Sequence, residues 1–394
     1  MTLPIRIRMT ARPIGESHRT ASPLELLFDL TFVIAVAALT SRFAHAVEDG
    51  HALDALVPFL QVFFAIWWAW MNHTWFASSF DTDDVPFRLL TLVQMAGVLV
   101  LAAGVPAALE DNDYRAVTFG YLIMRVGLIA HWLRAAIEDP ESRTTALRYV
   151  VGITVAEVGW VLRLVFAEAG VLSADALLAM FVALVLMELS VPLWAERKRP
   201  TSWHPHHIAE RHGLFAIILL GESVLAASTG VQRSIEAEGV SVPLVSIGVC
   251  ALVLVFALWW LYFLQPVAEG LVARRERSYV WGYGHYGVFA ALAGVGAGLE
   301  AAVVHLGHHG ATSAVAVAYA IAVPVAVFLT LVWALHVPLI ARPVLHPSVM
   351  LGGAVVVLLL PLAAVALSLA VVVALIAAAC GVVVGATIVL DRRA

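Results

Sequence analysis

The chain has 394 residues, of which 62% are hydrophobic and only 13% are charged, and its formal net charge at pH 7 is −5. Soluble domains carry about one quarter charged residues, so this composition and a mean hydropathy of +0.92 exclude an ordinary soluble domain. We expect a polytopic protein of the lipid bilayer with no nucleic-acid partner. Cys250 and Cys380 both lie within apolar runs, so neither a disulfide nor a metal pair is indicated.

Apolar segments long enough to cross a bilayer as helices recur along the whole chain. The predicted fold is therefore an all-α transmembrane helix bundle of about twelve spans. The predicted spans are 24–46, 54–79, 87–109, 115–137, 146–167, 174–195, 208–230, 242–266, 279–304, 312–337, 347–365 and 367–390. Only Pro361 and Ser368 interrupt the last two segments, so counts of ten and eleven stay open.

The distribution of positive charge predicts the orientation of these spans. Of the 23 Lys and Arg residues, 18 fall in loops or at span ends on the side of the N-terminus, three fall on the opposite side and two, Arg125 and Arg163, lie deeper within spans. Because loops rich in Lys and Arg stay in the cytoplasm, both termini are expected to be cytoplasmic. No apolar segment with a small-residue cleavage site follows the arginines before Pro23, so a removable signal peptide is not expected.

The two halves of the chain share landmarks. The stretch "LAAGVPAALE" at 101–110 matches "ALAGVGAGLE" at 291–300 at six of ten positions, and "IWWAWM" at 66–71 corresponds to "LWWLYF" at 258–263. We interpret them as parallel six-helix repeats, and chance matches in a sequence rich in Ala, Gly and Val are the alternative. The predicted parts are a cytoplasmic N-terminal segment, a first repeat, a cytoplasmic linker and a second repeat, over 1–22, 23–195, 196–207 and 208–390.

Three blocks of the sequence resemble a known family. They are "LELLFDLTFVIAVAALTSRF", "WWAWMNHTWFASSFDTDD" and "HHIAERHGLFAIILLGESVLA", and together they are similar to the signature blocks of the bacterial low temperature requirement protein A (LtrA) family. The resemblance implies a multispanning protein of the bacterial inner membrane, named for a growth phenotype in the cold. It implies no established reaction, so a function has to be argued from the polar residues of the spans.

Two carboxylates, Glu25 and Asp29, stand at the head of the first span. An ionised carboxylate at the bilayer centre costs about 2.5 to 3.5 kcal/mol on insertion scales, so such residues usually face a bundle interior or a wet cavity. Glu25 lies in the first turn, where the helix dipole favours negative charge, and a solvated helix end is its alternative. Asp29 lies roughly 6 Å deeper at 1.5 Å per residue, and an incidental interfacial acid is the alternative. We expect both to belong to an ion or substrate pathway.

Further polar residues fall at the depth of Asp29, in the third of the membrane nearest the cytoplasm. They are Asn72, His73, Gln94, Glu188 and His285. A shared vestibule that opens to the cytoplasm explains them most economically. Separate hydrogen bonds between neighbouring helices are the alternative.

Arg125, Glu157 and Glu222 lie nearer the middle of the membrane. Arg125 and Glu157 fall at matching depth on consecutive spans, so we expect a buried ion pair with a structural role. Glu222 has no cation at comparable depth in its own half, so it must pair across the halves, bind a cation or be protonated. We predict that Asp29 and Glu222 form a relay for protons or small cations.

Asp81, Asp83 and Asp84 follow the second span, and we expect them to form a cytoplasmic acidic rim that attracts cations. Helix capping by Asp84, with Pro86 in the next first turn, is the alternative. Histidines cluster at 204–212 and at 305–309, on opposite sides of the membrane. Neither cluster has the ligand spacing of a zinc site, so no metal and no cofactor is predicted.

Three classes of function stay open. A cation- or proton-linked transporter or channel accounts best for parallel repeats, buried carboxylates and a vestibule. A noncatalytic membrane-organising or signalling protein is one alternative. A membrane-embedded enzyme acting on lipid is the other, although the sequence has no P-loop and no GxSxG elbow.

Overall fold

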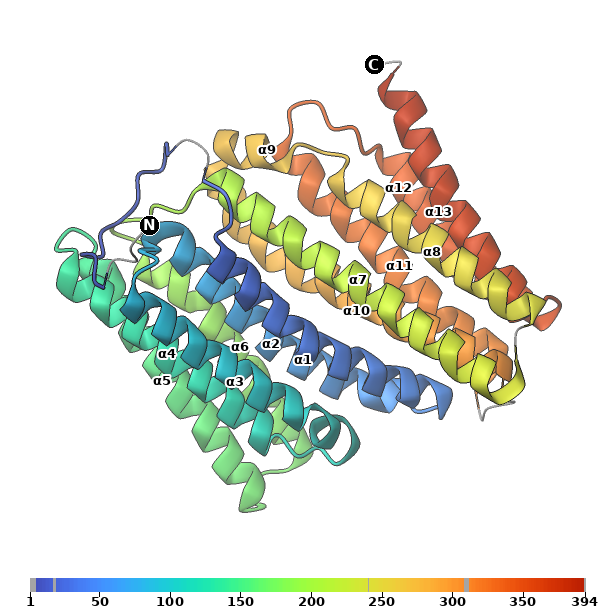
Figure 1. Ribbon diagram of the computed structural model, residues 1–394, viewed down its shortest axis with the longest axis horizontal. Helices are drawn as coiled ribbons and strands as arrows, with labels where there is room; N and C mark the ends of the chain where they lie inside the picture. Colours follow the sequence, from blue (N-terminus) through green and yellow to red (C-terminus); the bar gives the residue numbers. More distant parts are fainter. Residues whose placement is uncertain (1–4, 17–18, 240, 308–311, 393–394) are drawn as a thin grey trace. The chain divides into compact units, whose positions relative to one another are not determined.

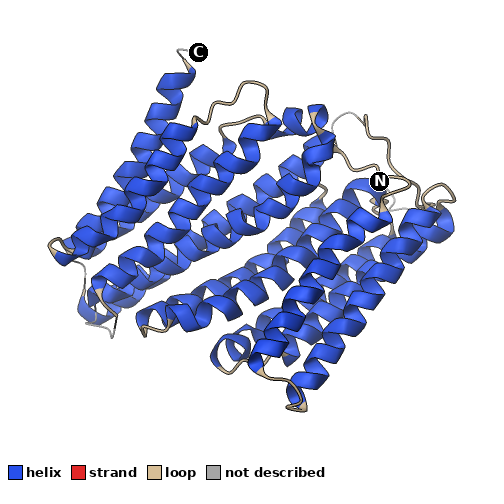
Figure 2. Cartoon of the chain, turned by 180° about the vertical axis from the view of Figure 1, so that it is seen from behind, coloured by secondary structure: helices blue, strands red, loops and turns tan. Residues whose placement is uncertain are grey.

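A computed structural model describes residues 5–16, 19–239, 241–307 and 312–392 (Figure 1). These residues form helices and their connecting loops and turns, without a strand (Figure 2). Twelve helices among them are long and apolar enough to cross a membrane. The predicted all-α fold with twelve spans is therefore confirmed, and the protein is a multi-pass membrane protein.

The helix boundaries agree closely with the predicted spans. The α-helices are α1 (Pro23–Glu48), α2 (Ala52–Phe80), α3 (Val85–Glu110), α4 (Arg115–Glu138), α5 (Arg143–Glu168), α6 (Ala174–Ala195), α7 (Pro205–Glu238), α8 (Val242–Phe263), α9 (Val267–Ala273), α10 (Ser278–Gly307), α11 (Ala314–His336), α12 (Pro347–Leu359) and α13 (Leu369–Asp391). Three short 3-10 helices are η1 (Arg275–Arg277), η2 (Val337–Leu339) and η3 (Leu360–Val365). Pro361 lacks an N–H group and lies in η3, where the α-helical part of this span has ended.

The chain divides into two compact units. Unit 1 comprises Met1–Ala35 and Ala65–Ile208, and unit 2 comprises Val36–Phe64 and Ala209–Ala394. Residues 36–64 thus group with the second part of the chain and not with the rest of the predicted first repeat, residues 23–195. The parallel six-helix repeat stays a prediction.

In unit 1, α3 packs against α4, α4 against α5 and α5 against α6. Glycines allow the closest of these contacts. A Cβ atom on Gly120 would lie 2.3 Å from the backbone nitrogen of Leu101 and 2.6 Å from the carbonyl oxygen of Gly97. The backbones of α3 and α4 therefore approach as closely as small residues permit in a membrane bundle.

The N-terminal segment is an integral part of unit 1. The Met9 side chain is fully buried in a core cluster that contains Phe76 and Trp132. Its backbone N–H donates to Oε2 of Glu138 at 2.6 Å, and the N–H of Ile7 donates to Oδ2 of Asp84 at 2.8 Å. The carboxylates of Glu138 at the end of α4 and Asp84 at the start of α3 thus bind the backbone of the N-terminal segment. The sequence of this segment shows no helical periodicity.

In unit 2, α10 packs against α11 and α8, and α13 packs against α8. Hydrogen bonds also connect residues 36–64 to the rest of this unit. The hydroxyl of Tyr286 on α10 donates to the Leu60 carbonyl oxygen at 2.9 Å, and the hydroxyl of Thr312 donates to the Val47 carbonyl oxygen at 2.8 Å. These bonds explain why the C-terminal part of α1 and the N-terminal part of α2 belong to unit 2.

Candidate functional site

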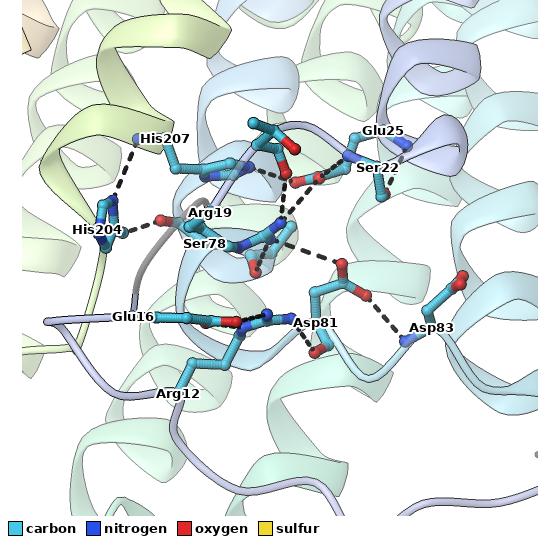
Figure 3. Close-up of polar contacts among 12 residues, drawn as sticks. Arg12, Glu16, Arg19, Ser22, Glu25, Ser78, Asp81, Asp83, His204 and His207 are labelled. Atoms are coloured by element: carbon cyan, nitrogen blue, oxygen red, sulfur yellow. Dashed lines mark hydrogen bonds and ion pairs between the residues drawn. The ribbon is translucent and has the colours of Figure 1, made fainter.

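Four charged or titratable side chains meet inside unit 1, and we call them the charged cluster (Figure 3). They are Arg19, Glu25, Asp81 and His207. Each comes from a different element: the N-terminal segment, α1, the turn after α2 and the first turn of α7. Glu25 and His207 are fully buried, and Arg19 and Asp81 are each 7% exposed.

Glu25 stands at the centre of the charged cluster. Its Oε1 lies 3.0 Å from Nε2 of His207, and its Oε2 lies 3.6 Å from Nη1 of Arg19. Nη2 of Arg19 in turn lies 3.6 Å from Oδ2 of Asp81. Because Glu25 is fully buried, its interpretation as a solvated helix end is wrong.

Local hydrogen bonds hold these side chains in place. Ser22 and Glu25 form a capping box at the start of α1, in which the Ser22 N–H donates to Oε2 of Glu25 at 2.8 Å. The His204 N–H donates to Oγ of Ser78 at 2.9 Å, which fixes the segment before α7 on the end of α2. Oδ1 of Asp81 accepts from the N–H of Asp83 at 2.9 Å in a tight turn.

Within the charged cluster, the pKa of Asp81 is shifted toward neutral pH. Burial raises the pKa of Asp81 to about 6, and the negative charge of Glu25 raises it as well, while the guanidinium of Arg19 lowers it. A carboxyl group with such a pKa exchanges protons near neutral pH, as groups in proton-transfer sites do.

This shift predicts a pH-dependent stability. The folded-state pKa of about 6 exceeds the ordinary value of 3.8, so folding is favoured when Asp81 is protonated. The contribution is complete below the unfolded-state pKa and is lost as the pH rises through the folded-state pKa; its size is about 3 kcal/mol. Between pH 4 and pH 7, wild-type protein in detergent should lose thermal stability relative to Asp81→Asn. Parallel profiles of unfolding midpoint against pH would contradict this assignment.

The other two members of the predicted acidic rim have different partners. Asp84 is the N-cap of α3 with a Pro in the first turn, as its alternative interpretation predicted. Burial raises the pKa of Asp84, but hydrogen bonds from Arg134 and from backbone N–H groups lower it by a larger amount, so the net pKa lies below the ordinary value. Asp83 pairs with Arg88 at 2.8 Å, and of the three carboxylates only its side chain is substantially exposed, at 45%.

One turn farther along α1, Asp29 meets α2. The indole N–H of Trp70 donates to Oδ1 of Asp29 at 2.7 Å, and Asp29 is 2% exposed. The ring of His73 lies 4.0 Å from that of Phe28 and 6.1 Å from that of His131 on α4. Asp29, Trp70 and His73 therefore form a second buried polar level beyond the charged cluster.

A third level surrounds Glu188 on α6. Oε2 of Glu188 lies 3.1 Å from Nη2 of Arg125, and Nε of Arg125 lies 3.4 Å from Oε1 of Glu157. Glu188 also accepts hydrogen bonds from three aromatic side chains on three helices. They are Trp68 at 2.9 Å, Tyr121 at 2.8 Å and Trp160 at 3.2 Å. The structure thus brings Arg125 and Glu157 together, as the sequence suggests, and adds a second carboxylate.

The helix α2 contributes a side chain to every level. Ser78 binds the segment that carries His207, Trp70 binds Asp29 and Trp68 binds Glu188. We call the three levels together the polar column of unit 1. Trp68 and Trp70 are site residues that the sequence analysis missed, and the available signal was that a buried indole N–H usually requires a hydrogen-bond acceptor.

Other residues of the predicted vestibule have local roles or lie elsewhere. The Asn72 amide donates to the Trp68 carbonyl oxygen of its own helix at 2.8 Å. Gln94 is buried where α3 meets Gly127 of α4. His285 belongs to unit 2, where its Nε2 lies 3.0 Å from the Tyr262 hydroxyl.

Glu222 lies on α7 in unit 2 and is 5% exposed. Glu300 on α10 is close enough to interact with it electrostatically, and Glu300 accepts a hydrogen bond from the Ser41 hydroxyl at 3.4 Å. Asp29 belongs to unit 1, so the relay between Asp29 and Glu222 stays a prediction.

Within the described ranges, no group of three or more His, Cys, Asp or Glu side chains is arranged to hold a metal ion. His207 of the first histidine cluster binds Glu25 instead. Of the second cluster, His308 and His309 lie outside the described residues.

Comparisons with known proteins identify one family. The profile described as "Bacterial low temperature requirement A protein (LtrA)" matches residues 20–387. An uncharacterized protein of Rhizobium meliloti (strain 1021) is 27% identical over 302 residues, which cover 72% of this chain and 70% of that protein. No solved structure matches the chain.

Proposed function

The chain belongs to the bacterial low temperature requirement A (LtrA) family, whose profile matches most of its length, and we propose that this family member is a proton-linked transporter or channel. We place it in the bacterial inner membrane with both termini in the cytoplasm. The observation that carries the proposal is the buried charged cluster. Three successive contacts of at most 3.6 Å connect His207 to Glu25, Glu25 to Arg19 and Arg19 to Asp81.

Burying such groups is costly, which supports a functional role. Glu25 and His207 lie in the first turns of the membrane-spanning helices α1 and α7, and ionisable side chains within membrane spans usually mark ion pathways or proton relays. A purely structural contact between these segments would need only one well-matched ion pair, whereas this cluster adds a histidine and a second carboxylate. Asp81, whose pKa of about 6 allows proton exchange near neutral pH, lies at the end of the cluster nearest the loops.

The three levels of the polar column provide successive polar groups along which a proton could move inside unit 1. Asp29 lies one helical turn beyond Glu25, and Glu188 forms the next level with Arg125. We infer that protons enter at Asp81, exchange between Glu25 and His207, and move on toward Asp29. Glu222 would serve the same purpose among the residues of unit 2.

The test is proton uptake by proteoliposomes containing wild-type or variant protein. Glu25→Gln keeps the size of the side chain and an oxygen that can accept from Ser22, but it removes the exchangeable carboxyl proton. We expect uptake at least tenfold below wild type in Glu25→Gln, and likewise in Glu222→Gln. Glu16→Gln is the matched control, because Glu16 pairs with Arg12 at a partly exposed position and should leave uptake unchanged.

Folding is checked separately by the thermal unfolding midpoint of each purified variant. A role in hydrogen bonding alone predicts that Glu25→Gln folds and takes up protons normally while Glu25→Ala fails to fold. Undiminished uptake in a folded Glu25→Gln variant would therefore overturn the proposal. A wild-type protein that binds a partner but shows no uptake would favour the membrane-organising alternative.

A further inference from the structure

Unit 2 contains a pocket of about 380 Å³ that is lined by no residue of the polar column. Its walls come from α7, α8, the segment before and including the start of α9, α10 and α11. Most of the wall is apolar, with Leu214, Ile217, Phe263 and Pro266 among the residues. Volumes of this order are typical of small-molecule sites.

Two buried polar side chains face this pocket with unused hydrogen-bonding groups. Trp281 on α10 is 2% exposed and His336 on α11 is 1% exposed, and both line the pocket. Within the part of the chain that the structure describes, neither the indole nitrogen of Trp281 nor either ring nitrogen of His336 has a hydrogen-bond partner. A buried donor without a partner costs free energy, so these groups point to a ligand that supplies one.

The neighbouring hydrogen bonds define what the pocket offers. Nδ1 of His285 lies 2.7 Å from the carbonyl oxygen of Trp281, which can only accept, so Nδ1 carries the proton. Nε2 of His285 therefore accepts from the hydroxyl of Tyr262 at 3.0 Å. The oxygen of Tyr262, which also lines the pocket, keeps an accepting lone pair.

The arrangement of Trp281 is fixed by its neighbours. The ring of His212 lies 4.5 Å from that of Trp281, and the ring of His285 lies 4.3 Å from it on the same helix as Trp281. Such packing holds the indole in one orientation, so its N–H direction is preset for a ligand.

These groups select the chemistry of the ligand. Trp281 offers only a donor, while a neutral His336 offers one donor and one acceptor. An alcohol matches them, since its oxygen accepts from an N–H and its proton is donated to a ring nitrogen or to Tyr262. An ammonium can only donate, so it would leave the Trp281 N–H without an acceptor, even though the carboxylate of Glu210 also lines the pocket. A carboxylate can only accept. Among the described residues that line the pocket, no Lys or Arg is present to balance an anion.

We propose that this pocket binds an uncharged alcohol whose hydroxyl lies between Trp281 and His336 and whose apolar body contacts Phe263 and Leu214. The alcohol could be supplied by the bilayer, as the free hydroxyl of a lipid, or by the aqueous phase. Both sources share the hydroxyl chemistry that the pocket recognises.

The probe is 4-fluorobenzyl alcohol, observed by fluorine NMR with the full chain in nanodiscs. We expect saturable binding that 4-fluorotoluene, 4-fluorobenzoate and 4-fluorobenzylamine do not reproduce. In Trp281→Phe a smaller aromatic ring remains and the N–H is lost, so the dissociation constant should rise about five- to tenfold. His336→Phe should weaken binding similarly.

Trp333→Phe is the matched control, because the Trp333 indole nitrogen is also buried without a partner in the described chain but does not line the pocket. It should bind the probe as wild type does. Displacement of the probe by a monoacylglycerol assigns the alcohol to the bilayer, and displacement by glycerol assigns it to water. Equal binding of 4-fluorotoluene, unchanged binding in folded Trp281→Phe, or no saturable binding would each overturn the proposal.

Discussion

Replacing Arg125 by methionine is expected to destabilise the protein by about 3 to 5 kcal/mol, the range for breaking a buried ion pair. Arg125 is 1% exposed and lies within 3.4 Å of carboxylate oxygens of both Glu157 and Glu188. Its removal leaves two buried carboxylates facing each other without a cation. Glu157→Gln should cost less, because Glu188 still pairs with the guanidinium.

Unfolding in mixed micelles of increasing denaturing detergent measures this loss. Arg163→Met is the matched control, since Arg163 is also buried on a transmembrane helix but donates to the carbonyl oxygen of Leu177 and lies over Tyr114. Arg125→Lys keeps the charge and should fall between the wild type and Arg125→Met. A loss of stability in Arg125→Met no larger than that in Arg163→Met would show that Arg125 does not stabilise the carboxylates of the third level.

The second large effect is expected for Gly120→Ala on α4. The added Cβ would meet backbone atoms of α3 at 2.3 and 2.6 Å, and backbone cannot move aside as the end of a side chain can. The helices must separate, which should cost about 3 kcal/mol as overpacking does. This outweighs the gain of roughly 1 kcal/mol in helix propensity that Gly→Ala brings elsewhere.

Gly221→Ala provides the comparison, because a Cβ there would have no atom within 4 Å. Its unfolding midpoint should equal or exceed that of the wild type, whereas that of Gly120→Ala should fall by several degrees. Equal midpoints for the two variants would show that α3 and α4 do not approach as closely as described.

The spans were predictable because hydropathy alone determines which segments cross a bilayer. The same holds for the N-cap of α3, since Asp84 and Pro86 form a local signal. Arg125 and Glu157 could be paired from matching depth on consecutive helices. In each case the feature could be predicted from neighbouring residues or from position along a helix.

The remaining parts of the site depend on contacts between distant segments. Depth along the helix assigned Glu188 to the level of Asp29 and gave no direction for its side chain, so its contact with Arg125 on the third level was not predicted. Glu25 is buried because residues before α1 and at the start of α7 cover it, and neither segment carries a periodic signal. The division of α1 between two units likewise arises from long-range packing.

The central claim, proton movement through the protein, is tested most directly with wild-type proteoliposomes that contain a pH-sensitive dye. A potassium gradient with valinomycin sets a negative interior potential, and no other ion gradient is imposed. We predict acidification of the interior that exceeds the rate in protein-free vesicles and increases with the imposed potential. A rate equal to that of protein-free vesicles at every potential, with correctly folded protein, would contradict the claim.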